Sequence, residues 1–395
     1  MNRPRVLSRS EARAYLVGQL GLARPRRERG AAGVRAMLDA LGCVQIDPLD
    51  PMGTNADLVA LARVDGIARG DVFRHTLPGH AFEHWAKERC LLPARAFAYY
   101  RARSANGGDV VETPWWRTSE RAGRLPAGVL EAVREEIAVR GPIPASALSD
   151  RGHVEPFDWA GWRGTTKAAS MAIEVLWTRC EIVVAGRTGR EKLWAVPAHA
   201  LPDHHDAAAD GHFDRWALAE RVRAAGLLPR GGGAAWSTTL RGARTSGVVD
   251  EMLADGTLEE VAIEGDSRRR LLAARSAVDR KVSKPDDRMR LLGPLDPLLW
   301  DRDLVRTVFG FEYLWEVYKP AKLRRWGWYV VPLLHRGRLV GRLEGRAVGT
   351  TLAIDRVWRE RGIDFDEDAL DAALERHADA CGCDEVRRAS RARRR

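Results

Sequence analysis

The segment Cys43–Pro48 places an amide and a carboxylate two positions apart, and the spacing of this pair suggests chemistry. It follows a helical pattern that stops at Gly42, and it is typical of a short strand. Gln45 and Asp47 then lie on one face of the strand, about 7 Å apart. Such a pair can hold one water, because the amide donates and accepts hydrogen bonds and the carboxylate takes a proton or stabilises a nearby cation.

A polar–apolar–polar triplet before a proline is also typical of a surface strand that ends in a turn. The pattern of Gln45, Ile46 and Asp47 by itself does not separate that structural role from a catalytic one. The other features of the chain therefore decide how the segment is interpreted.

The length and charge of the chain limit the number of domains and the kinds of partner that it can have. A chain of 395 residues predicts two or three domains, or several small modules that share a core. The net charge is +10, and only seven of the 64 basic residues are lysine. The planar guanidinium group of arginine suits phosphate binding, which favours a nucleic-acid partner. A GC-rich genome would produce the same arginine bias without any such function.

Cysteine usage and hydropathy predict a soluble cytoplasmic protein. Five widely spread cysteines argue against a disulfide framework and for a reducing compartment. The N-terminus lacks the apolar run of a signal peptide, and no window reaches about 18 consecutive apolar residues. His377, Cys381 and Cys383 form a metal-like spacing, but no second pair of ligands accompanies them. We expect no metal and no cofactor.

Two stretches share the order helix, strand, turn, strand, which is the second half of a winged helix. The first has a helix at 166–179 and strands at 181–185 and 192–196, and the second has a helix at 245–254 and strands at 258–263 and 269–274. Further helices are predicted upstream, at 125–140, 144–148 and 215–225. The N-terminal region predicts a third copy with a less obvious wing, from helices at 11–20, 31–41 and 56–63.

The predicted fold is α+β, with three tandem winged-helix modules and a C-terminal region that contains a β-hairpin. The modules span residues 1–110, 120–200 and 210–278, and the first holds the Gln45–Asp47 motif. A β-rich region follows at 285–380, and residues 385–395 are predicted to be a basic, disordered tail.

Several cationic residues are candidate DNA contacts. Winged helices often bind nucleic acid, although many serve only as protein–protein modules. Arg187 and Arg190 lie in the turn of one wing, whereas the turn of the other carries Glu264 and Asp266, so we do not expect the modules to bind DNA equivalently. Arg63 and Lys87 in the first module complete the candidates from the winged-helix region.

The C-terminal third predicts a hairpin with strands at 328–334 and 338–343. Its tip carries His335, Arg336 and Arg338, which would either enter a DNA groove or form an ordinary solvated turn. Arg324 and Arg325 precede the hairpin among aromatic residues and are further candidates for DNA contact.

With these pieces in place, the sequence resembles the winged-helix DNA glycosylases of the AlkZ/AlkX (YcaQ) family. Gly42–Asp47 matches the Gln-apolar-Gln/Asp catalytic motif of that family, and Ala81–Ala86 resembles its Phe-Glu-x-Trp segment. The longest similarity lies in the C-terminal third, at residues 294–302, 309–313, 316–318, 327–332 and 339–342.

The resemblance implies three winged helices around a concave, positively charged DNA channel. It implies excision of bulky N7-alkylguanine adducts from double-stranded DNA and, in some members, unhooking of interstrand crosslinks, in repair or in self-resistance to a genotoxic natural product. Asp47 at the third motif position resembles the AlkX branch, since the AlkZ branch has Gln there. We expect a monomer that works on the bacterial nucleoid and has no membrane partner.

The chain departs from the family pattern at two places. Lys87 stands where a histidine is expected, and Ala347–Thr351 replaces a basic segment after Arg346. Both departures bear on the range of lesions more than on the type of reaction.

The chemistry of such a lesion suits this motif. N7-alkylguanine carries a formal positive charge and is already a good leaving group, so a general acid contributes little. The barrier lies in oxocarbenium character at the sugar and in delivery of water to C1′. Asp47 would stabilise the cation and accept the proton of the water, while Gln45 would orient that water or a sugar oxygen.

Two other functions remain open. A non-enzymatic winged-helix regulator would not need Asp47 and would usually be a symmetric dimer on a specific sequence. A protein that binds adducts without excising them would act by sequestration, and the intact Gln45–Asp47 motif argues against it.

Overall fold

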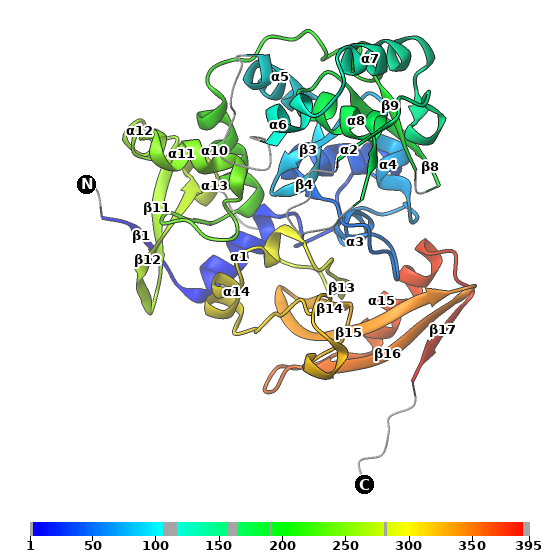
Figure 1. Cartoon of the computed structure of the whole chain (residues 1–395). Coiled ribbons are helices and arrows are strands. Elements are labelled where there is room, and N and C mark those ends of the chain that lie inside the picture. Colours follow the sequence, from blue (N-terminus) through cyan, green and yellow to red (C-terminus); the bar gives the residue numbers. More distant parts are fainter. Residues whose placement is uncertain (1–2, 106–116, 156–163, 190, 280–282, 390–395) are drawn as a thin grey trace. The chain divides into compact units, whose positions relative to one another are not determined.

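The computed structural model describes residues 3–105, 117–155, 164–189, 191–279 and 283–389, which form a mixed α+β fold (Figure 1). The chain divides into two compact units, each assembled from separate stretches. The first unit holds Met1–Val72, Leu218–Ser237 and Ser246–Arg395, and the second holds Phe73–Ala217 and Thr238–Thr245. The boundaries of the three winged-helix modules stay predictions.

The N-terminal helices of the first unit begin and end at local signals. α1 (Arg9–Gln19) starts with a capping box in which Ser8 and Glu11 bond reciprocally. α2 (Gly30–Leu41) ends at Gly42, whose φ of 74° is left-handed and favours glycine. α3 (Asn55–Leu61) starts with a second capping box, formed by Thr54 and Asp57. The helices predicted at 11–20, 31–41 and 56–63 are thus confirmed to within two residues.

A four-stranded sheet in the first unit has the order β1-β11-β12-β10. Its strands are β1 (Arg5–Leu7), β10 (Leu228–Pro229), β11 (Leu258–Ile263) and β12 (Asp266–Ala274). β1 pairs in parallel with β11, and the other pairs are antiparallel. α12 (Val248–Ala254) contacts β11, and α13 (Arg275–Val278) contacts β12. α10 (Phe213–Ala225) crosses from the second unit into the first, and α11 (Arg241–Thr245) belongs to the second unit. The predicted order of helix, strand, turn and strand between 245 and 274 is confirmed.

The C-terminal part of the first unit is a five-stranded sheet of order β13-β14-β15-β16-β17. Its strands are β13 (Arg290–Leu291), β14 (Val330–His335), β15 (Arg338–Val348), β16 (Thr351–Arg359) and β17 (Glu385–Arg388). The predicted hairpin is confirmed as β14 and β15, which pair from Val330 with Glu344 to His335 with Arg338. α14 (Arg302–Phe309) lies between β13 and β14 in the chain.

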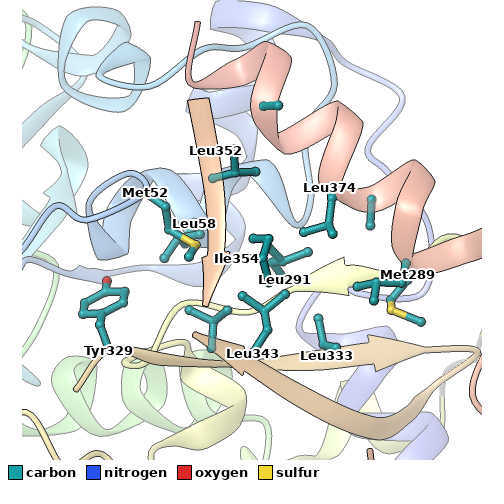
Figure 2. Packing of buried hydrophobic residues seen from close by; sticks show 14 of the residues in the cluster. Met52, Leu58, Met289, Leu291, Tyr329, Leu333, Leu343, Leu352, Ile354 and Leu374 are labelled. Atoms are coloured by element: carbon teal, nitrogen blue, oxygen red, sulfur yellow. The ribbon is translucent and has the colours of Figure 1, made fainter. Parts of the chain in front are cut away.

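Helix α15 (Glu367–Ala380) packs on this sheet through a shared hydrophobic core (Figure 2). Leu370 and Leu374 of the helix contribute to the core, together with Leu343 of β15 and Ile354 of β16. Met52 and Leu58 belong to the same cluster, so the segment that follows the Gln45–Asp47 motif is packed against the C-terminal sheet.

The disordered tail is predicted to begin at residue 385, but the first residues of that range form a strand. Residues Glu385–Arg388 form β17, which pairs in parallel with β16 from Thr351 to Ile354. The parallel partner lies 34 residues upstream of Glu385, so no local sequence signal announces this strand. Residues 390–395 of the predicted tail lie outside the described residues.

The second unit contains three small antiparallel arrangements of strands, together with several helices. β3 (Ala81–Ala86) and β4 (Glu88–Pro93) form a hairpin, and β8 (Val183–Thr188) pairs with β9 (Glu191–Ala195), which also pairs with β5 (Ile143–Pro144). β6 (His153–Val154) pairs with β7 (Thr166–Lys167). The helices are α4 (Asp71–Thr76), α5 (Phe97–Ala105), α6 (Arg117–Gly123), α7 (Val129–Arg140), α8 (Ala168–Thr178) and α9 (Pro197–Ala200). The order predicted between 166 and 196 is confirmed in α8, β8 and β9.

No helix in the described ranges is both long and apolar enough to cross a lipid bilayer.

A buried ion pair joins the N-terminal helices of the first unit to its C-terminal part. Arg63 donates to both carboxylate oxygens of Asp296, at 2.7 and 3.0 Å, and neither side chain is more than 1% exposed. The guanidinium group also donates to the carbonyl oxygens of Leu20 and Val59. Asp296 in turn accepts from the backbone N–H of Leu298 and caps the turn that it begins.

Breaking this pair should strongly destabilise the protein. Asp296→Asn or Arg63→Met leaves a buried charge without its partner, which we expect to reduce the free energy of unfolding by about 3–5 kcal/mol. Urea unfolding followed by circular dichroism measures the loss.

The matched control is Asp303→Asn, which breaks the exposed Arg306–Asp303 pair on α14 and should leave the unfolding midpoint unchanged. The double variant Arg63→Met/Asp296→Asn should be more stable than the sum of the two single changes predicts. Single variants as stable as the wild type would contradict this account of the pair.

Candidate active site

The motif residues lie at the end of a tightly terminated helix. Gly42 closes α2 in the left-handed conformation, and the chain then enters the short strand β2 (Val44–Gln45). Gln45 and Asp47 are each only 8% exposed. The motif is therefore a largely buried polar pair, and not the surface strand that its pattern also allowed.

Asn55 ties the motif strand to the C-terminal block. Its side-chain amide donates to the backbone carbonyl of Gln45 at 2.8 Å, and its side-chain oxygen accepts from the backbone N–H of Leu295 at 2.9 Å. A side chain at Gly293 would meet the Asn55 oxygen at 2.5 Å, so glycine is required for this approach. The sequence analysis did not single out Asn55, because its partner lies 240 residues away.

The side-chain oxygen Oε1 of Gln45 is buried and accepts no hydrogen bond from any residue in the described ranges. A buried polar atom without a partner loses free energy relative to water unless a ligand or solvent molecule satisfies it. The backbone of Gln45 serves structure, and its side chain remains available for a ligand.

Asp47 has one engaged and one available carboxylate oxygen. Oδ1 accepts from the backbone N–H of Leu49 at 2.9 Å, which forms a turn around Pro48. Within the described part of the chain, no residue donates to Oδ2. Burial raises the pKa of Asp47, and the Leu49 hydrogen bond opposes that shift only in part. A carboxylate with a raised pKa is a better proton acceptor.

Tyr329 is a neighbour of Asp47 that the sequence analysis missed. Its side chain is buried, and its hydroxyl has no partner among the described residues. Burial raises the pKa of the Tyr329 phenol, and the Asp47 carboxylate is the foremost of the neighbouring charges that raise it further. The hydroxyl points toward the segment that carries Met52 and Leu58 (Figure 2). In the sequence, Tyr329 is only one aromatic residue among several.

Asp57 is another buried carboxylate near the motif, and both of its oxygens accept hydrogen bonds. Oδ2 of Asp57 accepts from the backbone and hydroxyl of Thr54, and Oδ1 accepts from the backbone N–H of Gly70 at 2.9 Å. Asp57 is therefore a structural residue, in contrast to Asp47.

Two of the predicted DNA contacts, Arg63 and His335, are buried side chains with internal partners. Arg63 is buried in its pair with Asp296 and presents no surface to a phosphate. His335 is 4% exposed, and its ring bonds the backbone carbonyl of Asp287 at 3.0 Å. The helical position of Arg63 and the hairpin-tip position of His335 gave no sign of these long-range partners.

The other hairpin arginines lie at the surface. Arg336 and Arg338 are exposed, and Arg336 is bonded to Asp287 at 2.8 Å. Arg325 is also exposed and bonds Glu312 at 2.6 Å, whereas Arg324 is half-buried and donates to the carbonyl of Lys319. These four residues remain predicted DNA contacts.

Arg187 has a structural partner in the second unit. Glu83 of β3 is completely buried and carries ion pairs with Arg187 and with Lys192, the latter at 2.6 Å. The Arg187 guanidinium group also lies 4.1 Å over the ring of Phe73. Arg187 therefore neutralises a buried carboxylate, and binding a phosphate would compete with that role. Arg190 lies outside the described residues, and Lys87 is half-buried between β3 and β4.

His84, which follows Glu83, is not an acid–base group. Its ring is buried and contacts the backbone carbonyl of Trp177 at 3.2 Å. Burial lowers the pKa of His84 to about 3, so the imidazole stays neutral at physiological pH.

The residues with metal-like spacing near the C-terminus, His377, Cys381 and Cys383, contribute to packing. His377 is buried on α15, and its Nε2 contacts the carbonyl oxygen of Met52 at 2.7 Å. In the described ranges, no cluster of three or more His, Cys, Asp or Glu residues is arranged to hold a metal ion.

Comparisons with known proteins bear on the whole chain. A family model described as DNA glycosylase AlkZ-like matches residues 38–380. Among solved structures, the Streptomyces sahachiroi DNA glycosylase AlkZ is similar, with a TM-score of 0.57 and 18% sequence identity. The similarity covers 97% of this chain and 99% of that chain. At this identity, the structural likeness shows a shared mixed α+β fold.

The buried charge of Asp47 should reduce stability, so Asp47→Asn should raise the thermal unfolding midpoint at neutral pH. Asparagine keeps the shape and can still accept from Leu49. The folded-state pKa is raised, so the gain is full above that pKa and shrinks as pH falls through it. Below the ordinary carboxyl range, both states of the wild type are protonated and the difference disappears.

The exposed Asp384 provides the control, because Asp384→Asn should leave the midpoint unchanged across the same pH range. A lower midpoint for Asp47→Asn at neutral pH would mean that the Asp47 charge is stabilised by interactions other than those described.

Proposed function

The chain belongs to the family of AlkZ-like DNA glycosylases, and on that premise we propose that it hydrolyses the N-glycosidic bond of N7-alkylated guanine in double-stranded DNA. The observation that carries this proposal is the state of the motif residues. Asp47 is a buried carboxylate with one oxygen that accepts no hydrogen bond in the described residues, and Gln45 beside it has an unpartnered side-chain oxygen. Both residues are proposed to lie at the reacting centre.

The lesion supplies the leaving group of the reaction, and the protein activates the water and stabilises the sugar cation. The bond between C1′ and N9 breaks, and its electron pair neutralises the positive charge of the alkylated base. A water oxygen bonds to C1′ and gives its proton to Asp47. The negative charge of Asp47 also stabilises the oxocarbenium character of the sugar, and the partly buried position strengthens that attraction relative to water.

Gln45 has the role of positioning. Its buried side-chain oxygen can accept a hydrogen bond from the attacking water, and its amide nitrogen can donate to a sugar oxygen. The hydrogen bond from Asn55 to the backbone of Gln45 supports this role, because it keeps the strand in place while the side chain binds.

The finer assignment follows the motif. Asp47 at the third position is the feature of the AlkX-like branch. We propose bulky N7-alkylguanine monoadducts as substrates, with interstrand crosslinks as a further class, in repair of alkylation damage or in self-resistance. A monomer acting in the bacterial cytoplasm fits this role.

DNA contact is assigned to winged-helix modules and to the C-terminal hairpin. The arrangements α8-β8-β9 and α12-β11-β12 have the order of helix, strand, turn and strand that winged helices use. On the hairpin, Arg338 is exposed and has no bonded carboxylate among the described residues. Burial lowers the pKa of Arg13, and the positive charge of Arg338 lowers it further.

The activity can be tested on duplex DNA that carries a single 7-methylguanine, with alkaline cleavage of any abasic site. We expect the wild type to release the base. Asp47→Asn should bind the duplex with unchanged affinity and lose excision by about 100-fold or more, since general-base catalysis contributes about 10²–10⁴-fold. Gln45→Ala should be slower than the wild type by a smaller factor.

Asp384→Asn serves as the control and should excise like the wild type. Excision at the wild-type rate by Asp47→Asn would remove Asp47 from the reaction. If neither the wild type nor any variant yields an alkali-sensitive site, the assay is repeated with a bulkier N7 adduct. A second negative result would mean that the protein binds DNA without excising the base.

Arg336→Ala and Arg338→Ala should weaken duplex binding and reduce the slope of log affinity against log salt by about one unit for each lost phosphate contact. Fluorescence anisotropy across a salt series measures the slope. Arg306→Ala, on α14, is the control, because Arg306 is an exposed arginine that lies outside the hairpin. An unchanged slope in both hairpin variants would make the tip an ordinary solvated turn.

A further inference from the structure

The segment Tyr318–Arg325 exposes apolar side chains that a folded protein normally covers. Among the described residues, six large apolar side chains are exposed, and Tyr318, Leu323 and Trp328 are three of them. Tyr318 is 84% exposed and Leu323 is 68% exposed. Concentration of exposed apolar groups in one short segment marks a surface that meets a partner.

Buried Glu316 holds this segment in a defined conformation. Its carboxylate pairs with the Lys319 ammonium group at 2.9 Å and accepts from the backbone N–H groups of Arg325 at 2.9 Å and Trp326 at 2.8 Å. Burial acts to raise the pKa of Glu316, but these donors outweigh it and lower the pKa, so the carboxylate stays charged. The two ends of the segment are thereby clamped to one buried group.

The far end of the segment is anchored in the C-terminal sheet. Trp326 lies edge-on to Trp358 of β16 at 5.7 Å between ring centroids. The guanidinium group of Arg342, buried on β15, lies 4.1 Å from the ring centroids of both Trp326 and Phe311. Tyr318 and Leu323 therefore project from a rigid base, so little conformational entropy would be lost when they bind a partner.

The positive charge of the segment indicates an anionic partner. From Tyr318 to Trp328 the sequence holds four cations and no acidic residue. Lys319 and Arg325 are paired with Glu316 and Glu312, which precede the segment, so Lys322 and Arg324 carry the charge that is not neutralised by a carboxylate in the described residues. Two aromatic residues, Trp326 and Trp328, accompany Tyr318 in the same stretch. Aromatic rings interleaved with cations match a nucleic acid, which offers base faces for stacking and phosphates for ion pairing.

We propose that Tyr318–Arg325 is a DNA-contacting ridge, in which Tyr318 and Leu323 pack against bases or sugars and Lys322 and Arg324 bind phosphates. The proposal rests on the proposed function for its partner, duplex DNA. It adds an apolar contact that the hairpin arginines do not provide. Side chains that enter a groove loosen base stacking at the contact, which would ease access to the glycosidic bond of a lesion.

Binding and base stacking can be measured without catalysis. Fluorescein-labelled undamaged duplex reports affinity by anisotropy, and a duplex with 2-aminopurine brightens when a base is unstacked. Tyr318→Ala and Leu323→Ala should each weaken affinity about fivefold or more, the range for loss of a stacking or apolar contact. Both should reduce the 2-aminopurine signal at saturating protein, whereas Tyr318→Phe should retain it.

Val139→Ala is the matched control, because Val139 is as exposed as Tyr318 but lies on α7, in the other unit. It should bind and brighten like the wild type. Unfolding midpoints equal to the wild type show that the surface changes leave the fold intact. Wild-type affinity and signal in both Tyr318→Ala and Leu323→Ala would overturn the proposal and assign the exposed segment to a protein partner.

Excision of 7-methylguanine or a bulkier adduct, measured in parallel, separates this proposal from the proposed function. If the wild type excises while the ridge variants bind and brighten like it, the ridge assignment fails and the glycosylase assignment stands. If the wild type does not excise either base, but the ridge variants bind DNA more weakly than the wild type and give a lower 2-aminopurine signal, the ridge assignment stands. A wild type that binds no DNA overturns both.

Discussion

The buried pair of Arg63 and Asp296 is the interaction on which the first unit depends. It joins residues 233 positions apart, and neither charge could stay buried without the other. Arg63 also bonds the end of α1 and the third helix, while Asp296 starts the turn that leads to α14. Next to this pair, Asn55 links the same C-terminal block to the strand of Gln45. The position of the motif is therefore a consequence of long-range polar contacts in the core.

Carboxylates in this protein divide by whether their oxygens are satisfied. Asp57 and Glu316 each accept several hydrogen bonds, and Glu83 carries two ion pairs, so donors occupy their oxygens. Asp47 accepts one hydrogen bond at one oxygen, and no described residue donates to the other. Burial raises the pKa of both Asp47 and Asp57, so the open oxygen, and not the pKa, distinguishes Asp47. This distinction supports the proposal that Asp47 is the catalytic carboxylate of this AlkZ-like DNA glycosylase family member.

The arginine-rich composition has two separate origins in the structure. Some arginines are internal: Arg63 and Arg342 are buried, and Arg187 neutralises the buried Glu83. Their planar groups satisfy several acceptors or stack on rings, which lysine could not do in the same geometry. Others, such as Arg338 and Arg325, remain exposed. Only the exposed group can contribute directly to DNA affinity, so net charge overstates the number of phosphate contacts.

Local signals in the sequence determined much of the secondary structure and the motif. The capping box of Ser8 and Glu11, the terminating Gly42 and the apolar-rich strand at 258–263 are local features, so the elements could be predicted at nearly their observed bounds. The spacing of Gln45 and Asp47 likewise identified the candidate pair. Tertiary structure alone decided which polar groups are available. The burial of Arg63 and His335, the proximity of Tyr329 to Asp47 and the parallel pairing of β17 arise from residues distant in sequence. Burial and partner choice are properties of the packed chain, and a side chain becomes structural or reactive according to the partners that packing brings to it.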